Sequence, residues 1–197
     1  MPRIPYPQPE QLDEEARNMM AGIPPLHVFR MLSYSGPALA GFLEFGTRLV
    51  NSLKITSGLQ VITEIVTVRV AHLSGCAYEL AQHERSIAAL GVAPEKIAAL
   101  RRGADQSALS KSERAAVALT DDIVANVRAS DQTLGEMRRY FSDRQVIELI
   151  LLAGSYRMLA MMIETTGVDI EAQGEVEQLS TEELGRRFRA KLDAKKK

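Results

Sequence analysis

The chain has 197 residues, of which 46% are hydrophobic, and this is enough for one compact domain with a substantial core. Its formal net charge of −1 gives no basic excess to neutralise a phosphate backbone, which argues against nucleic acid as a partner. No apolar run reaches the roughly 18 to 20 residues that span a bilayer. The start of the chain, Met1 to Pro7, lacks the apolar segment of a secretory signal, so a cytoplasmic location without membrane contact is expected.

The predicted elements are all helices, because apolar residues recur at spacings of three and four and no period-two strand pattern is found. The expected fold class is therefore all-α. In chain order, the predicted helices run from Gln11 to Met20, Pro37 to Leu53, Ser57 to Leu73, Cys76 to Leu90, Pro94 to Arg101, Ser110 to Ala129, a short one from Ser130 or Asp131, and Ser142 to Thr166.

Specific residues mark where these helices begin and end. The paired prolines Pro24 and Pro25 deny continuation of the first helix. Ser110 and Glu113 have the spacing of a capping box, which predicts a helix start. Gly91 follows an apolar stretch and predicts a C-cap.

Residues 1–170 are predicted to form a single helical domain with its core motif at 57–91, followed by a charged tail over 171–197. The tail is expected to fray or to pack on a partner subunit. Near the end of the last helix, five apolar residues form a run too broad for one buried stripe, so this helix either faces another subunit or is fully buried. These residues are Met158, Leu159, Met161, Met162 and Ile163.

Glu64 lies on a predicted helix that is apolar on nearly every side. An unpaired charge in such a place is costly, so the carboxyl group must be protonated or paired. One interpretation is a structural salt bridge, and the other is a carboxyl group whose raised pKa suits it to proton transfer near neutral pH.

The next predicted helix carries Cys76, Glu79 and His83 at offsets of three and seven, so one stripe presents a thiol, a carboxylate and an imidazole. The turn Ser74-Gly75 folds this helix back against the helix of Glu64. His83 and Glu64 then meet if the two helices cross suitably. Cys76 is the single cysteine of the chain, which excludes an intramolecular disulfide and a cysteine-only zinc site.

A glutamate, a cysteine twelve residues later and a histidine seven residues after that resemble the carboxymuconolactone decarboxylase family, which includes the alkylhydroperoxidase D-like proteins. The resemblance spans about Ser57 to Gly91 and extends more loosely towards Val168. It implies an all-helical domain that assembles into trimers or hexamers, with a pocket between the two motif helices near a subunit boundary.

The peroxidase members of that family use a Cys-x-x-Cys pair whose second cysteine attacks the peroxide. Cys76 matches the first cysteine of the pair, but Glu79 stands at the second position. Peroxidase turnover in this branch requires Cys76 to attack and an external thiol to resolve the product. Thr63 stands where an arginine commonly precedes the family glutamate, which weakens the transfer of a carboxylate-binding role.

The resemblance favours a cofactor-independent lyase that decarboxylates a small carboxylated lactone or a related acid. His83 is the expected general acid, Glu64 its orienting partner or proton relay, and Tyr78 and Glu79 are expected substrate-binding groups. Arg69 either holds a substrate carboxylate or snorkels to the helix surface.

Three alternatives stay open. The first is a thiol oxidoreductase that uses Cys76, because a helix N-terminus lowers the pKa of a thiol. The second is a metal-carboxylate protein built on Glu79 and His83. Di-metal helical proteins usually repeat the glutamate and histidine pair on a second helix, and the lack of a histidine at the corresponding position after Glu148 argues against this alternative. The third is a helical assembly module whose polar cluster is structural. No metal and no cofactor is expected, and the expected partners are a small-molecule substrate and other copies of the chain.

Overall fold

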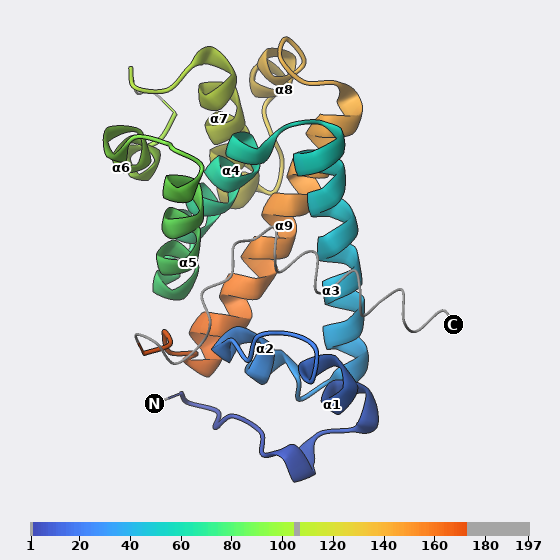
Figure 1. Ribbon diagram of the computed structural model, residues 1–197. Coiled ribbons are helices and arrows are strands. Elements are labelled where there is room, and N and C mark those ends of the chain that lie inside the picture. The colour runs from blue at the N-terminus through green and yellow to red at the C-terminus, as the bar shows by residue number, and fades with distance from the viewer. Residues whose placement is uncertain (1, 105–106, 173–197) are drawn as a thin grey trace. The chain divides into compact units, whose positions relative to one another are not determined.

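The structure is a computed structural model that describes residues 2–104 and 107–172. Within those ranges the chain is helical and contains no strand, which confirms the all-α fold class. The elements are η1 Pro9–Gln11, α1 Glu14–Met20, α2 His27–Leu32, α3 Gly36–Val50, η2 Asn51–Thr56, α4 Gln60–Leu73, α5 Ala77–Ala89, α6 Pro94–Arg102, α7 Lys111–Asn126, α8 Asp131–Met137 and α9 Asp143–Thr166 (Figure 1).

Contacts group the chain into two compact units. Among the described residues, unit 1 combines 2–51 with 163–172, and unit 2 comprises 52–104 and 107–162. The predicted tail lies outside the described residues, apart from its first two positions.

In unit 1, helices α1 and α2 both pack on α3. The first helix begins later than predicted, at Glu14, because the Asp13 side chain accepts a hydrogen bond from the Ala16 amide at 2.7 Å and caps it. Helix α2 was not predicted. Pro24 and Pro25 end the preceding segment, but they also precede α2, where prolines are compatible with a helix start.

The predicted helix from Pro37 to Leu53 is divided at its end. Helix α3 stops at Val50, and the backbone continues as the π-helical segment η2. The wider turn of a π-helix changes the direction in which its side chains leave the backbone, and such segments are frequent at functional sites. Lys54 lies in this segment.

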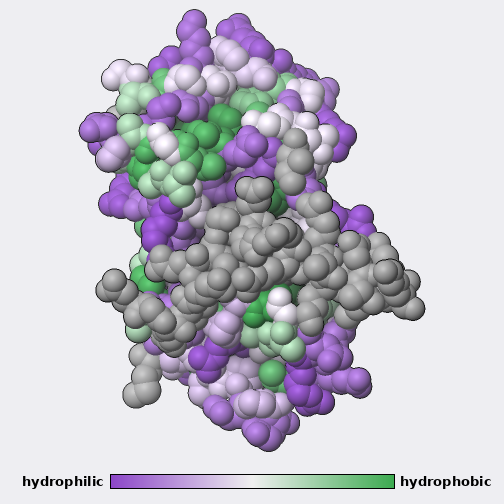
Figure 2. Space-filling model, viewed as in Figure 1, coloured by the Kyte–Doolittle hydropathy of each residue, from purple (hydrophilic) through white to green (hydrophobic). Residues whose placement is uncertain are grey.

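Helix α4 is central in unit 2, where it packs against α5, α6 and α7 (Figure 1). It has no polar face, and all ten residues from Ile62 to Ala71 are buried. After Leu73 the chain turns at Gly75, whose φ of +64° is in the left-handed region that favours glycine. Helix α5 therefore packs back along α4, as the turn predicted. In Figure 2, apolar side chains gather on the surface of unit 2 near these helices.

Helix α9 is long and apolar enough to cross a membrane by length and composition, which corrects the expectation that no stretch of the chain reaches that length. A core helix of a soluble protein meets the same criterion, and Leu149, Leu152 and Ala153 are almost completely buried within the protein. The two predicted alternatives were that α9 faces another subunit or is fully buried; Met158 and Met161 are both more than half exposed in the single chain, and contact with another subunit stays a prediction. A fully buried α9 is therefore wrong.

Candidate active site

Glu64 is the centre of a cluster of polar side chains inside unit 2. Only 1% of the residue is exposed, since α4 is covered by its neighbours. One carboxylate oxygen, Oε2, lies 2.8 Å from His83 Nδ1 on α5. The other oxygen, Oε1, accepts a hydrogen bond from the Lys54 ammonium group of η2. The structure thus brings Glu64 and His83 together and adds a cation that was not predicted.

The charge state of Glu64 follows from these two contacts. Burial raises the pKa of the carboxyl group, but the interactions with the His83 ring and the Lys54 ammonium outweigh burial and lower the pKa to about 2. The expectation of a raised pKa is therefore wrong, and the alternative of a paired carboxylate is correct. Glu64 is a fixed anion at neutral pH and not a proton donor.

Tyr156 of α9 completes the cluster. Its ring meets the His83 ring edge to face, with 4.9 Å between the ring centroids. Burial, together with the charges of Glu64 and Glu79, raises the pKa of the Tyr156 hydroxyl, which also hydrogen-bonds with Thr67. Tyr156 is consequently a neutral phenol beside the imidazole at physiological pH.

His83 has one ring nitrogen available for chemistry. Its Nδ1 atom is used by Glu64, and among the described residues Nε2 has no hydrogen-bond partner. The pattern is that of an imidazole oriented by a carboxylate, with the second nitrogen positioned for proton transfer. The side chain is 13% exposed, so the ring is mostly shielded from water.

The other predicted site residues on this helix, Cys76, Tyr78 and Glu79, lie at the N-terminal end of α5. Cys76 is the N-cap residue of α5 and is fully buried. Tyr78 and Glu79 lie in the first turn and are also buried. The charge of Glu79 reaches Tyr156, which places this carboxylate near the same cluster.

The structure does not place the Arg69 side chain beside His83. Five residues along a helix rotate a side chain by about 140°, so Arg69 leaves α4 on a different side from Glu64. Its guanidinium donates to Asp121 Oδ1 at 2.5 Å, and to the carbonyls of Leu100 and Arg101 at 2.9 and 3.0 Å. Snorkelling to the surface is wrong, because only 7% of Arg69 is exposed. Arg69 instead ties α4 to α6 and α7.

Sequence reasoning missed Lys54 and Tyr156. Lys54 is an isolated cation in an apolar stretch before a helix with a buried glutamate, and that glutamate required a counter-ion. This requirement was a usable signal for Lys54. Tyr156 lies far along the chain, and no local pattern connects it with His83. Among the described residues, no group of three histidine, cysteine or acidic side chains is arranged to hold a metal ion.

The chain is similar to known proteins in sequence and in fold. Residues 42–122 match the model of the carboxymuconolactone decarboxylase family, and this range contains Lys54, Glu64, Cys76 and His83. The uncharacterized protein YdfG of Bacillus subtilis is 24% identical over 91 residues, which are 45% of this chain. The chain matches 62% of the length of that relative.

Two solved structures share the fold. An uncharacterized peroxidase-related protein from Ralstonia eutropha, described as an alkylhydroperoxidase AhpD core, has a TM-score of 0.66 at 15% identity, over 88% of this chain and 94% of its own. A protein of unknown function from Agrobacterium tumefaciens, for which an AhpD-type antioxidant defence role has been suggested, has a TM-score of 0.61 at 18% identity, over 70% of this chain and 93% of its own. The match to the carboxymuconolactone decarboxylase family model covers residues 42–122, which are less than half of the chain, and the two structural likenesses show that the chain has an AhpD-like helical fold.

Proposed function

We propose that this protein is a cofactor-independent lyase that decarboxylates a small carboxylated lactone or a similar acid, with His83 as general acid. The observation that carries the proposal is the 2.8 Å contact between His83 Nδ1 and a Glu64 carboxylate whose other oxygen is paired with Lys54. Glu64 orients the imidazole, and the buried setting keeps water from competing for the proton.

The proposed step balances without a cofactor. The bond between the substrate's carboxylate carbon and the adjacent carbon breaks, CO2 leaves, and the electron pair remains as an enolate on the lactone. His83 donates its Nε2 proton to that carbon, and water returns a proton to the imidazole afterwards. Arg69 is not assigned to substrate binding, because its guanidinium is engaged by Asp121 and two carbonyls.

The test is CO2 release from a carboxylated lactone, with deuterium incorporation into the product in D2O. We expect His83→Gln to lower kcat by about 10²- to 10⁴-fold, the range of a general acid. His72→Gln is the matched control, because His72 is a second histidine of the same unit outside the cluster. Equal activity of His83→Gln and wild type would overturn the proposal.

A second candidate, a thiol peroxidase, is favoured by the position of Cys76 at the N-terminus of α5. In that reaction the thiolate attacks a hydroperoxide, the O–O bond breaks, the alkoxide takes a proton from His83, and an external thiol reduces the resulting sulfenic acid. The full burial of Cys76 counts against it, because peroxide must reach the sulfur. Hydroperoxide-dependent oxidation of an external thiol that is lost in Cys76→Ser would establish this activity.

We also propose that the protein assembles as a trimer or a hexamer through α9. Four large apolar residues of α9 are exposed by 45% to 59% and, with Gly154, they recur at spacings of four, three, four and three. That spacing is typical of a seam between packed helices, and glycine permits close approach of two backbones. We name this set the α9 stripe: Ile147, Leu151, Gly154, Met158 and Met161.

A further inference from the structure

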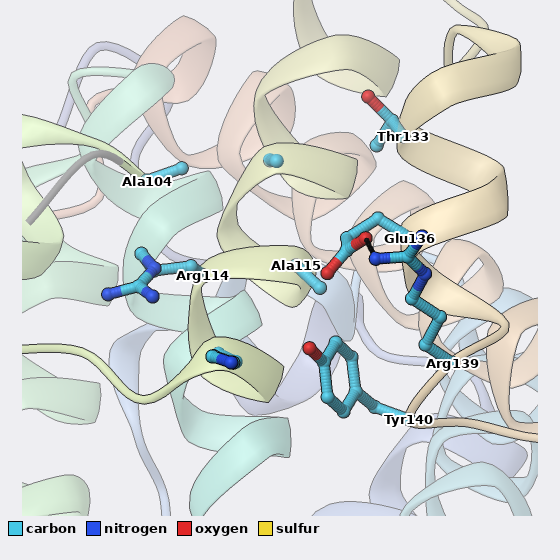
Figure 3. Close-up of a pocket in the computed structure, with 9 residues that line it drawn as sticks. Ala104, Arg114, Ala115, Thr133, Glu136, Arg139 and Tyr140 are labelled. Atoms are coloured by element: carbon cyan, nitrogen blue, oxygen red, sulfur yellow. Dashed lines mark ion pairs between the residues drawn. The ribbon is translucent and has the colours of Figure 1, made fainter.

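A cavity of about 410 Å³ lies between α7 and the end of α8, within unit 2 (Figure 3). None of the residues that line it belongs to the cluster of Lys54, Glu64, His83 and Tyr156. Its volume is within the range of about 300 to 1,000 Å³ that is usual for small-molecule sites. The lining residues used below are Lys111, Arg114, Ala115, Glu136, Arg139 and Tyr140.

The charges around this cavity do not cancel. Glu136 is its one carboxylate, and Arg139 Nη1 pairs with Glu136 Oε2 at 2.9 Å. Tyr140 also hydrogen-bonds with Glu136. The other charged residues that line the cavity are Lys111 and Arg114, and neither forms an ion pair with any residue in the described ranges. Two positive charges therefore line the cavity without a counter-ion among those residues.

Within the described residues, the Arg114 guanidinium uses only part of its hydrogen-bonding capacity. Its Nη1 donates to the Leu109 carbonyl at 3.0 Å, which anchors the side chain at the start of α7. Its other N–H groups have no acceptor among the residues that the structure describes. A guanidinium that is held at one end and open at the other is suited to bind an oxyanion with little loss of side-chain entropy.

The rest of the cavity is apolar in part. Ala115 on α7 lies opposite Tyr140, whose ring forms one wall (Figure 3). Burial and the hydrogen bond with Glu136 raise the pKa of Tyr140, so the ring carries a neutral hydroxyl. Small alanine side chains on α7 leave room for a flat or compact body beside the ring.

We propose that this cavity binds a small organic anion, whose carboxylate or phosphate head contacts Arg114 and Lys111 and whose apolar body packs between Ala115 and Tyr140. This site is separate from the Glu64–His83 site and does not depend on the proposed lyase activity. Binding at it is measurable without any turnover.

The test is calorimetric titration of the full chain with phenyl phosphate and benzoate, and with benzyl alcohol as a neutral probe of similar size. We expect saturable binding of at least one anion and binding of benzyl alcohol that is at least about tenfold weaker, because charge-assisted hydrogen bonds contribute most of the affinity. Arg114→Gln should weaken anion binding by about tenfold or more, and Lys111→Gln by about threefold to tenfold.

Arg128→Gln is the matched control, because Arg128 is an exposed arginine just beyond the end of α7 that does not line the cavity. It removes the same charge and should leave affinity unchanged within about twofold. Lys111→Gln changes an exposed side chain and keeps the test valid if Arg114→Gln disturbs the start of α7.

Three outcomes would overturn the proposal. One is an absence of saturable anion binding by the wild-type protein at millimolar concentrations. Another is equal weakening by Arg114→Gln and Arg128→Gln, which would show a response to net charge only. The third is loss of phenyl phosphate binding in His83→Gln with no change in Arg114→Gln, which would place the ligand in the Glu64–His83 site.

Discussion

Glu64 is buried as an anion, and the Lys54 ammonium and the His83 ring beside it explain why this is tolerated. A buried ion pair contributes little net stability compared with well-packed apolar residues, because desolvation offsets the attraction between the charges. Removal of one partner is costly, since the remaining charge is then uncompensated. The cluster is therefore better explained by what it does for His83 than by stabilisation of the fold.

The low pKa of Glu64 makes a prediction about stability and pH. The folded pKa of about 2 lies below the ordinary value of 4.5, so the contribution of Glu64 is fully present above pH 4.5. It is lost as pH falls through the folded pKa, and the loss amounts to about 3 kcal/mol. The difference in free energy of unfolding between wild type and Glu64→Gln should shrink by this amount in urea titrations from pH 5 to pH 2. A difference that does not change with pH would contradict the prediction.

Lys54 provides a second prediction at this cluster. Lys54→Met removes the ammonium that pairs with the Glu64 carboxylate, so the pKa of Glu64 should rise and the free energy of unfolding should fall by about 3 kcal/mol at pH 7. Lys54→Arg keeps the charge and should retain most of the stability. Denaturant unfolding of both variants measures this difference. A Lys54→Met protein as stable as wild type would show that the ammonium does not compensate Glu64.

Residue patterns along α4 and α5 made Glu64 and His83 a candidate pair, because one tight turn at Gly75 connects the two helices, but their contact depends on how the helices cross. They were insufficient for Tyr156, which comes from a helix far along the chain. The charge state of Glu64 could not be predicted either, because it depends on pairing with Lys54. The π-helical backbone of η2 sets the direction in which the Lys54 side chain points.

At the scale of elements, helix boundaries were predicted best where a side chain caps the helix. The Ser110 hydroxyl accepts a hydrogen bond from the Glu113 amide, and the Glu113 side chain accepts one from the Ser110 amide, as the capping box predicted. Helix α2 and the π-helical segment have no such signal. Leu26 makes no side-chain capping bond, and η2 continues α3 without a break in the apolar pattern.

The capping box allows a direct test. Ser110→Ala removes the acceptor for the Glu113 amide and should lower the free energy of unfolding by about 1 kcal/mol. Ser107→Ala, in the exposed loop before α7, is the control and should have no measurable effect. Urea denaturation followed by circular dichroism measures both. Equal stability of Ser110→Ala and wild type would contradict the capping role.

The end of α7 contains a strained residue. Val127 is the C-cap with φ of 66°, a conformation that is unfavourable for a β-branched side chain, and it is 92% exposed. Val127→Gly relieves the strain without loss of packing and should raise the free energy of unfolding by about 1 kcal/mol. Val127→Ala should have a smaller effect of the same sign. A decrease on thermal or urea denaturation of Val127→Gly would contradict this prediction.

At the scale of the whole molecule, unit 2 contains both the Glu64–His83 cluster and the cavity between α7 and α8. Helix α7 connects them physically, because it packs on α4 and, through Asp121, accepts a hydrogen bond from Arg69. The apolar pattern of the sequence predicted the buried helices of this unit. It did not predict the cavity, because Lys111 and Arg114 line one cavity with Tyr140 only after α8 packs on α7.

The α9 stripe makes the last prediction, which concerns assembly. If it is a seam between copies, a double substitution of Leu151→Glu and Met158→Glu should convert the proposed trimer or hexamer into a monomer by light scattering, because carboxylates cannot be buried there unpaired. Both side chains are about half exposed within one chain, so helical content should be retained. Leu90→Glu, at the exposed C-cap leucine that follows α5 and lies outside the stripe, is the control and should leave the mass unchanged. If the wild-type protein is monomeric and floats with lipid vesicles, the apolar surface of α9 contacts a membrane, and the proposed seam between copies is wrong.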